Sequence, residues 1–557
     1  MPRPKLGELL VEQGLISLDQ LKQALDEQKR TGEFLGSVLT RLGLVSNARL
    51  LPLLAQQVGM PYVRLDDRRI PPEVIAKVPP KFASHYHLMP LALSGNSLQV
   101  AIVDPFDIQT LDELKLLLDC DVSPVLASQE EIEEAIQRHY GIGASAVERL
   151  LTAGGRAMAA AASQAEDLTA GADEASVIAF VNQLLLSAVR DRATDIHIEP
   201  FDQLLRIRQR IDGVMYEIPI PADLVKLHQA VVSRIKVMAQ LDIAERRLPQ
   251  DGRIKVRMDG QDLDLRISVL PTSFGESVEI RILLSQMLFS LQELGLSGDH
   301  FDILSGLLQK PHGIIFVTGP TGSGKTTTLY ACLSKLNAPN VKILTIEDPI
   351  EYQLTGITQL QVHPKIGFSF SQGLRSMLRH DPDIMMVGEV RDPETAEITI
   401  RSALTGHLVF STLHTNDSAG GVTRLLDMGI EPYLVASSVL CFIAQRLVRV
   451  VCRACAEDLP SPPGLREEFG LAGEIPRTLR SGRGCQACKG TGYKGRTAIY
   501  EFLVASEPIQ RLILTRASSH EIARAAQAQG QMRSLRQDGW QRILQGITTR
   551  EEVLRVT

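Results

Sequence analysis

Residues 319–326 read Gly319-Pro320-Thr321-Gly322-Ser323-Gly324-Lys325-Thr326 and fit every fixed position of the phosphate-binding loop, or P-loop. Its three glycines let the backbone turn tightly, so that successive N–H groups point at one anion. Lys325 is expected to reach the β- and γ-phosphates of a nucleotide, and the hydroxyl of Thr326 to bind Mg²⁺. With Thr327 added, these residues form the predicted nucleotide-binding site, and nucleotide hydrolysis is the first hypothesis.

The sequence around the P-loop supports this interpretation. Residues 312–318 form a short apolar run typical of a buried strand, and residues 327–336 have the spacing of a helix. Strand, loop and helix follow one another in the order that the motif requires. A Gly/Ser-rich turn with a chance lysine is a poor alternative in this context.

Length and composition limit the other possibilities. The 557 residues predict about three or four domains. A net charge of −6 and 4% aromatic residues give little basis for binding nucleic acid, so none is expected as a partner. Neither a signal-peptide pattern nor an apolar run of about 20 residues is present in the sequence. We therefore expect a cytoplasmic protein that associates with a membrane only through partners.

The N-terminal part contains an internal repeat followed by a different unit. Lys5-Leu6-Gly7 recurs at a constant offset as Phe34-Leu35-Gly36, and the apolar spacing predicts two helical hairpins within residues 1–65. Residues 66–140 predict a small α/β module, with strands at 88–93 and 98–103. Residues 141–172 are rich in Ala, Gly and Ser and predict a flexible linker that is partly helical.

Two larger domains are predicted after the linker. In residues 173–290, a helix at 176–190 and several alternating strands indicate an α+β domain. In residues 291–557, apolar strands alternate with helices around the P-loop, which indicates an α/β fold with a parallel sheet.

Two carboxylates are candidates for the chemistry. Glu347 ends the predicted strand 341–346, and Glu389 follows the predicted strand 384–387. Carboxyl ends of parallel strands face the crevice where ligands bind. One acid can hold Mg²⁺-bound water while the other orients the attacking water. We assign Glu389 to Mg²⁺ together with Thr326, but the sequence leaves open which glutamate is the catalytic base.

Two histidines flank the apolar run 408–413. His407 precedes it, and His414 follows it among Ser, Thr and Asn, where a γ-phosphate sensor would lie. Both are candidate catalytic residues, although a purely structural role is the common one for such a histidine.

Four cysteines form two Cys-x-x-Cys pairs, Cys452 with Cys455 and Cys485 with Cys488. A two-residue gap lets each pair bind one tetrahedral ion, so the four predict a structural zinc site within about residues 450–495. The Pro-rich stretch 460–464 is interpreted as an inserted loop. Free buried cysteines are the less favoured alternative.

These motifs together closely resemble the secretion ATPases of type II secretion and type IV pilus assembly. The resemblance covers nearly the whole chain: an aspartate box at 345–351, a Walker B region at 378–389, a histidine box at 405–416, and two segments of the preceding domain, 194–200 and 247–253. It implies a RecA-like motor domain preceded by a mobile PAS-like domain. It also implies a homohexamer that uses ATP, Mg²⁺ and Zn²⁺.

The same resemblance implies partners and further site residues. The ring would act on an inner-membrane platform that assembles pilin-like subunits, with other docking proteins of the machine. Arg253 and Arg266 match family arginines that project toward a nucleotide held by a neighbouring domain or subunit. Surface ion pairs are the alternative for these two residues.

The N-terminal repeat resembles a family module that can bind cyclic di-guanylate through paired basic-Leu-Gly segments. Lys5, Leu6 and Gly7 fit this pattern, whereas Phe34 replaces the basic residue before Leu35 and Gly36. Docking to a membrane-anchored component is therefore the main expectation, and the dinucleotide is an additional candidate ligand.

Three functions compete at this point: a mechanical ATPase, a nucleic-acid motor of RecA type, and a cyclic-dinucleotide receptor. The first agrees best with the motifs. Within it, segments 421–429 and 444–450 look more like the type II secretion branch than the pilus branch.

Overall fold

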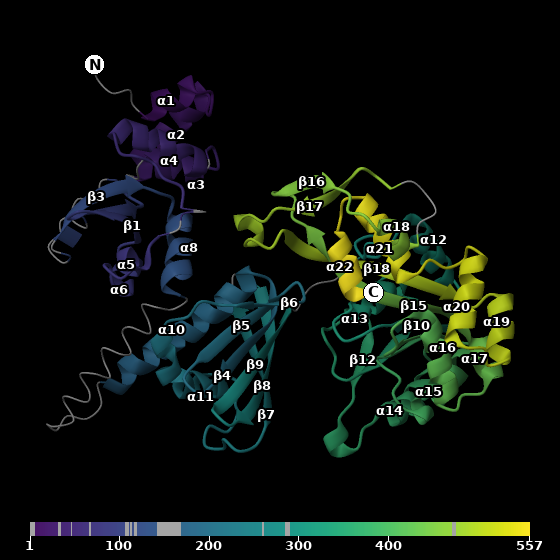
Figure 1. Ribbon diagram of the computed structural model, residues 1–557. Coiled ribbons are helices and arrows are strands. Elements are labelled where there is room, and N and C mark those ends of the chain that lie inside the picture. The colour runs from purple at the N-terminus through teal and green to yellow at the C-terminus, as the bar shows by residue number, and fades with distance from the viewer. Residues whose placement is uncertain are drawn as a thin grey trace. The chain divides into compact units, whose positions relative to one another are not determined.

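The computed structural model divides into two compact units, Met1–Ile282 and Leu283–Thr557 (Figure 1). It describes residues 6–31, 35–45, 47–65, 68, 70–105, 111, 114–115, 118, 120–141, 169–258, 261–284, 290–470 and 475–557. Among these residues, no helix combines the length and the apolar character needed to cross a bilayer.

The first unit begins with four short helices: α1 (Leu6–Glu12), α2 (Leu18–Thr31), α3 (Leu35–Arg41) and α4 (Asn47–Val58). A Cβ atom on Gly7 would lie 2.7 Å from Leu21, and one on Gly36 would lie 3.2 Å from Leu50. The two hairpins thus use the same glycine–leucine contact, as the predicted repeat requires. Lys5 and Phe34 lie outside the described residues.

A small α/β module follows these helices. Strands β1 (Leu88–Ser94) and β2 (Ser97–Ile102) are antiparallel, and β3 (Asp121–Leu126) pairs parallel to β2. Short helices α5 (Pro72–Ile75) and α6 (Pro80–His85) precede the sheet, and α8 (Gln129–Tyr140) follows it. The predicted strand pair and turn agree with this arrangement.

The rest of the first unit is an antiparallel sheet covered by two helices. Its strand order is β6-β5-β4-β9-β8-β7, and Figure 1 shows α10 and α11 beside it. The strands are β4 (Ala193–Pro200), β5 (Leu205–Ile211), β6 (Val214–Glu217), β7 (Gln250–Met258), β8 (Gln261–Thr272) and β9 (Gly275–Leu284). Helix α11 spans His228–Met238, and α10 (Thr169–Arg190) begins before the predicted Ser176 because alanine-rich sequence there favours helix.

The second unit is built on a seven-stranded sheet of order β12-β11-β13-β14-β10-β15-β18. Six strands are parallel, and only β18 runs antiparallel to its neighbour β15, a departure from the predicted parallel sheet. The strands are β10 (Gly313–Thr318), β11 (Ile343–Glu347), β12 (Thr358–Gln361), β13 (Ile384–Val387), β14 (Leu408–Leu413), β15 (Val439–Val451) and β18 (Tyr493–Val504).

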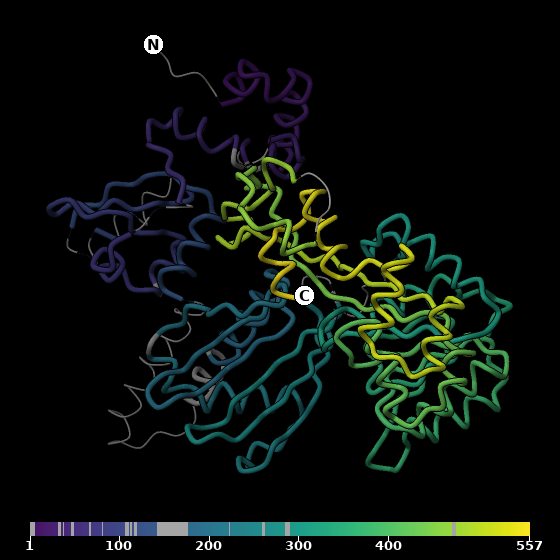
Figure 2. The backbone as a smooth tube through the Cα atoms, turned by 45° about the vertical axis from the view of Figure 1, so that its right-hand side comes forward, coloured from purple at the N-terminus to yellow at the C-terminus, as the bar shows by residue number. Residues whose placement is uncertain are grey.

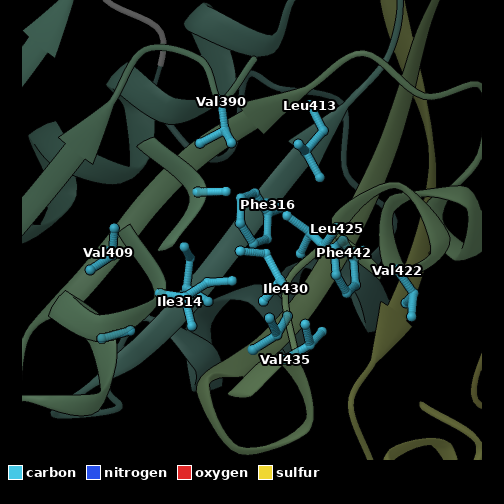
Figure 3. Packing of buried hydrophobic residues seen from close by; sticks show 14 of the residues in the cluster. Ile314, Phe316, Val390, Val409, Leu413, Val422, Leu425, Ile430, Val435 and Phe442 are labelled. Carbon is cyan, nitrogen blue, oxygen red and sulfur yellow. The ribbon is translucent and has the colours of Figure 1, made fainter. Parts of the chain in front are cut away.

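Helices cover both faces of this sheet, which explains why its strands read as continuous apolar runs. On one face, the rings of Phe316 and Phe442 stack 5.4 Å apart within the core shown in Figure 3. Helices α14 (Phe370–Met377), α15 (Pro393–Leu404), α16 (Ser418–Asp427), α17 (Pro432–Ser438), α19 (Glu507–Leu514) and α20 (Ser519–Ala528) supply that core. On the other face, α12 (Gly298–Leu307) and α13 (Lys325–Leu336) pack with Phe410.

The C-terminal segment after β18 also belongs to the second unit. Figure 2 shows this segment in yellow beside the green part of the same unit. It ends in α21 (Leu535–Leu544) and α22 (Arg550–Val556). A guanidinium nitrogen of Arg449 on β15 lies 2.6 Å from the buried carboxylate of Glu552 and holds α22 against the sheet.

A small hairpin, β16 (Ala456–Pro460) with β17 (Thr478–Gly482), lies between the two cysteine pairs. Helix α18 (Leu465–Phe469) follows β16 and buries Leu465 and Phe469. Residues 461–464 of the Pro-rich stretch lie outside any helix or strand, as expected for an inserted loop. The hairpin and α18 on either side of this loop were not predicted, and the two buried side chains of α18 pack with Trp540.

Candidate active site

The P-loop follows β10 directly and leads into α13, whose first residue is Lys325. Gly322 and Gly324 have φ values of +80° and +88°, which non-glycine residues rarely adopt. A Cβ on Gly319 would lie 2.7 Å from the carbonyl oxygen of Gln445. The glycines are therefore required by backbone conformation and by the close approach of β15.

Lys325 folds over the P-loop. Its Nζ donates hydrogen bonds to the carbonyl oxygens of Gly319 at 2.8 Å and Pro320 at 3.0 Å. Burial lowers the pKa of Lys325 to about 8; the negative charge of Glu389 opposes that shift, and the positive charge of Arg446 adds to it. A cation kept this close to the loop is well placed to meet phosphate oxygens.

The loop also contains a polar group with no protein partner. The hydroxyl of Ser323 is buried, and within the described residues it neither donates nor accepts a hydrogen bond. Thr326 and Thr327 lie in the first turn of α13 and are partly exposed. A buried lone hydroxyl, a folded lysine and a helix N-terminus together fit a bound triphosphate.

Glu389 lies at the end of β13 and faces the P-loop. Its carboxylate is 2.6 Å from Nε of Arg391 and 3.3 Å from Nε2 of His414. Its side chain is 12% exposed, and its charge acts on Lys325. The sheet therefore brings Glu389, His414 and Lys325 to the same edge, as predicted for the carboxyl ends of parallel strands.

Glu347 ends the neighbouring strand β11 but is held in a buried network. Its carboxylate accepts hydrogen bonds from Thr345 at 2.6 Å, from Gln359 at 3.1 Å and from the hydroxyl of Tyr330. Burial raises the pKa of Glu347, and these three donors oppose that shift. Tyr330 on α13 thus links Glu347 to the helix that follows the P-loop.

His407 is not brought to the P-loop. It precedes β14, with Nδ1 2.8 Å from the carbonyl oxygen of Ser402, whereas His414 follows the same strand. The strand between them spans about 20 Å at ~3.3 Å per residue. His407 therefore lies at the opposite edge of the sheet from Lys325.

The two predicted arginines belong to the first unit. Arg253 on β7 and Arg266 on β8 are directly paired across the strands. Arg253 is half exposed and forms a two-point ion pair with Asp264, at 2.6 Å and 3.3 Å. This places the two side by side on one sheet; their role toward a nucleotide stays a prediction.

Sequence reasoning missed three residues of this edge. Tyr330 holds Glu347, and Gln445 on β15 accepts a hydrogen bond from Thr328 at 2.7 Å and packs against Gly324. Arg446 follows Gln445 and packs against Gly319. Gln445 and Arg446 form a polar pair inside the otherwise apolar run 439–448, and this pair was the sequence signal that could have identified them.

The four paired cysteines come together as predicted. Their Sγ atoms all lie within 4.8 Å of one another, with closest separations of 3.8–3.9 Å. A tetrahedral Zn²⁺ with Zn–S bonds of about 2.3 Å requires sulfur atoms about 3.8 Å apart. Backbone N–H groups of Cys485 and Gly492 also point at the sulfur of Cys488. The cluster therefore fits a Cys₄ zinc ion.

Comparison with known proteins identifies the family. Residues 170–555 match the family model described as "Type II/IV secretion system protein". The chain belongs to this family. The members are secretion and pilus ATPases, so the protein is an ATPase. Residues 58–146 match a second model, described as the MshEN domain.

Relatives from both branches of the family match the full length. The "Type IV pilus assembly ATPase PilB" of Myxococcus xanthus is 43% identical over 561 residues, covering 99% of this chain and 98% of the relative. The "Type II secretion system protein E" of Xanthomonas campestris pv. campestris is 45% identical over 570 residues, with the same coverage.

Among solved structures, the ATPase DotB of Yersinia pseudotuberculosis matches with a TM-score of 0.50. The match has 19% sequence identity and covers 68% of this chain and 93% of that chain. At this identity it shows a shared fold alone.

Proposed function

We propose that this secretion ATPase works in type II protein secretion, as a cytoplasmic homohexamer that acts on an inner-membrane platform to assemble a pseudopilus. The observation that carries the proposal is the meeting of the P-loop, Glu389 and His414 at one edge of the sheet. The type II relative over the full length supports this branch. The equally complete pilus relative makes pilus assembly the second candidate.

In this proposal, the P-loop residues have separate tasks. The loop N–H groups and Lys325 hold the phosphates of ATP, and Thr326 with Glu389 would hold Mg²⁺. The bound ion supplies positive charge that neutralises the developing charge on the phosphates. His414 contacts the terminal phosphate from the end of β14.

We assign the role of base to Glu347. Burial raises the pKa of Glu347, which makes its carboxylate a better proton acceptor, and the donors around it fix its orientation. Arg253 and Arg266 supply positive charge from the preceding domain or from another subunit. The cysteine cluster holds Zn²⁺ as a structural ion with no open position.

The two glutamates are expected to respond differently to isosteric replacement. Glu347→Gln should lower kcat at least about 100-fold and leave ATP and Mg²⁺ binding unchanged, because it removes a base. Glu389→Gln should raise the Mg²⁺ concentration needed for half-maximal hydrolysis at least about tenfold, because it removes a charged ligand. Steady-state kinetics with Mg²⁺ titration and nucleotide-binding measurements check both.

Glu397→Gln is the matched control, since Glu397 is an exposed acid on α15 that pairs with Arg401. A changed Mg²⁺ requirement in Glu347→Gln alone would reverse the two roles. Normal kinetics in both variants would remove both glutamates from the site.

The branch of the family is tested in cells. With the chain as bait, the type II platform protein is expected to co-purify, and Lys325→Ala in the native locus is expected to stop enzyme secretion while pili still form. Loss of pili with intact secretion would favour the pilus candidate instead. Cyclic di-guanylate binding stays a prediction of the sequence, because Lys5 lies outside the described residues.

A further inference from the structure

Arg446 extends from β15 into the space between two loops of the active site. It is 8% exposed. One guanidinium nitrogen donates to the carbonyl oxygen of Asn416 at 2.7 Å, and the other donates to the carbonyl oxygen of Gln445 at 3.0 Å. The latter nitrogen lies 3.1 Å from where a Cβ on Gly319 would be. The guanidinium therefore fills the space between the start of the P-loop and Asn416.

No ion pair fixes this cation in the part of the chain that the structure describes. Glu501 and Asp417 are the nearby acids, but hydrogen bonds from the backbone and hydroxyl of Ser418 occupy the carboxylate of Glu501. An arginine keeps its charge at any physiological pH. Arg446 is thus a buried cation whose direct partners are neutral carbonyl groups.

The carbonyl group of Asn416 belongs to the loop that carries His414. Within the described residues, two hydrogen bonds join this loop to the elements beside the P-loop. One is the 2.7 Å bond from Arg446, and the other is a longer contact of 3.5 Å from the hydroxyl of Thr318 to the carbonyl oxygen of Asp417. Asp417 then caps α16 through the N–H of Gly420. Of the two ties, the one from Arg446 is the shorter and is charge-assisted.

We propose that Arg446 is a positioning residue for His414, which it serves by holding residues 414–417 against the P-loop. This inference rests on the proposed contact of His414 with the terminal phosphate. Without Arg446, His414 moves relative to the phosphate and to Glu389, from which it is now 3.3 Å away. Displacements of about 1 Å at such a site cost about 100-fold in rate.

The expected signature is kinetic. Arg446→Gln should lower kcat about 10- to 100-fold with little change in KM or in ADP affinity, because ADP lacks the terminal phosphate. Arg446→Lys should recover only part of the loss, since an ammonium group cannot replace the two-pronged guanidinium. Arg424→Gln on α16, an exposed arginine, is the control and should leave kinetics unchanged.

A double-mutant cycle tests whether Arg446 acts through His414. In a His414→Ala background, Arg446→Gln or Arg446→Lys should lower kcat less than about twofold further. The same fold-loss in both backgrounds would overturn this inference while leaving the role of His414 intact. Full activity in His414→Ala alone would overturn that role and this inference together. Arg446→Lys covers the case in which Arg446→Gln does not fold.

Discussion

Lys325→Ala is expected to abolish ATP hydrolysis, with kcat lowered at least about 1,000-fold. The side chain reaches back over the loop to within 2.8 Å of the carbonyl oxygen of Gly319, so its charge lies where phosphates would bind. No other lysine occupies the P-loop. Phosphate release by the purified full-length protein measures the effect.

Lys335→Ala is the matched control, because Lys335 lies exposed near the end of the same helix. It should retain normal turnover. Normal turnover in Lys325→Ala would contradict the assignment of the active site to the P-loop.

The pH dependence of the same lysine has a definite sign. Lys325 binds phosphate only when protonated, and its pKa is lowered to about 8. The kcat/KM for ATP should therefore have its maximal value at pH values well below 8, and it should fall as the pH rises through 8. The pH profile of kcat/KM measures this limb, and Lys335→Ala should show it unchanged.

Loss of zinc is the second change with a large expected effect. Structural zinc contributes about 10–16 kcal/mol of binding free energy in small domains, and the four cysteines join β15 to the start of β18. Cys452→Ser with Cys455→Ser should abolish zinc binding and lower the thermal midpoint by more than about 5 °C. Metal analysis and thermal unfolding measure the two results.

Hydrolysis should fall as well, because β15 carries Gln445 and Arg446 a few residues before Cys452. Cys120→Ser, outside the cluster, serves as the control and should keep the zinc content. Zinc content below one ion per wild-type chain, or unchanged stability of the double variant, would contradict a structural zinc ion.

The sequence predicted the parts of this site whose geometry is local. The P-loop needs glycines at fixed places because the backbone itself forms the anion site, so eight residues are enough to identify it. The cysteine pairs are similar, since a two-residue gap already sets the distance between two ligands of one ion. Glu389 and His414 were predicted as site residues because each follows the carboxyl end of a strand, and the carboxyl ends of parallel strands lie at the same edge of a sheet.

The same reasoning treated His407 and His414 alike, since both adjoin one strand. The direction of β14 separates them, and only His414 lies near Glu389. Likewise, Glu347 and Glu389 each follow a strand, yet Tyr330 and Gln359 enclose only Glu347. The hairpin between the cysteine pairs was missed because its strands are only five residues long and contain few apolar residues.

Sequence alone therefore indicated the family, the phosphate loop and the four clustered cysteines, because each depends on short motifs of residues close together in the chain. The tertiary structure decided which side chains share the site. Arg446 and Gln445 come from a strand more than a hundred residues beyond the P-loop, and their contacts with Gly319 and Gly324 exist only once β15 pairs with β10. Such contacts arise from strand order in the sheet, which no short motif records.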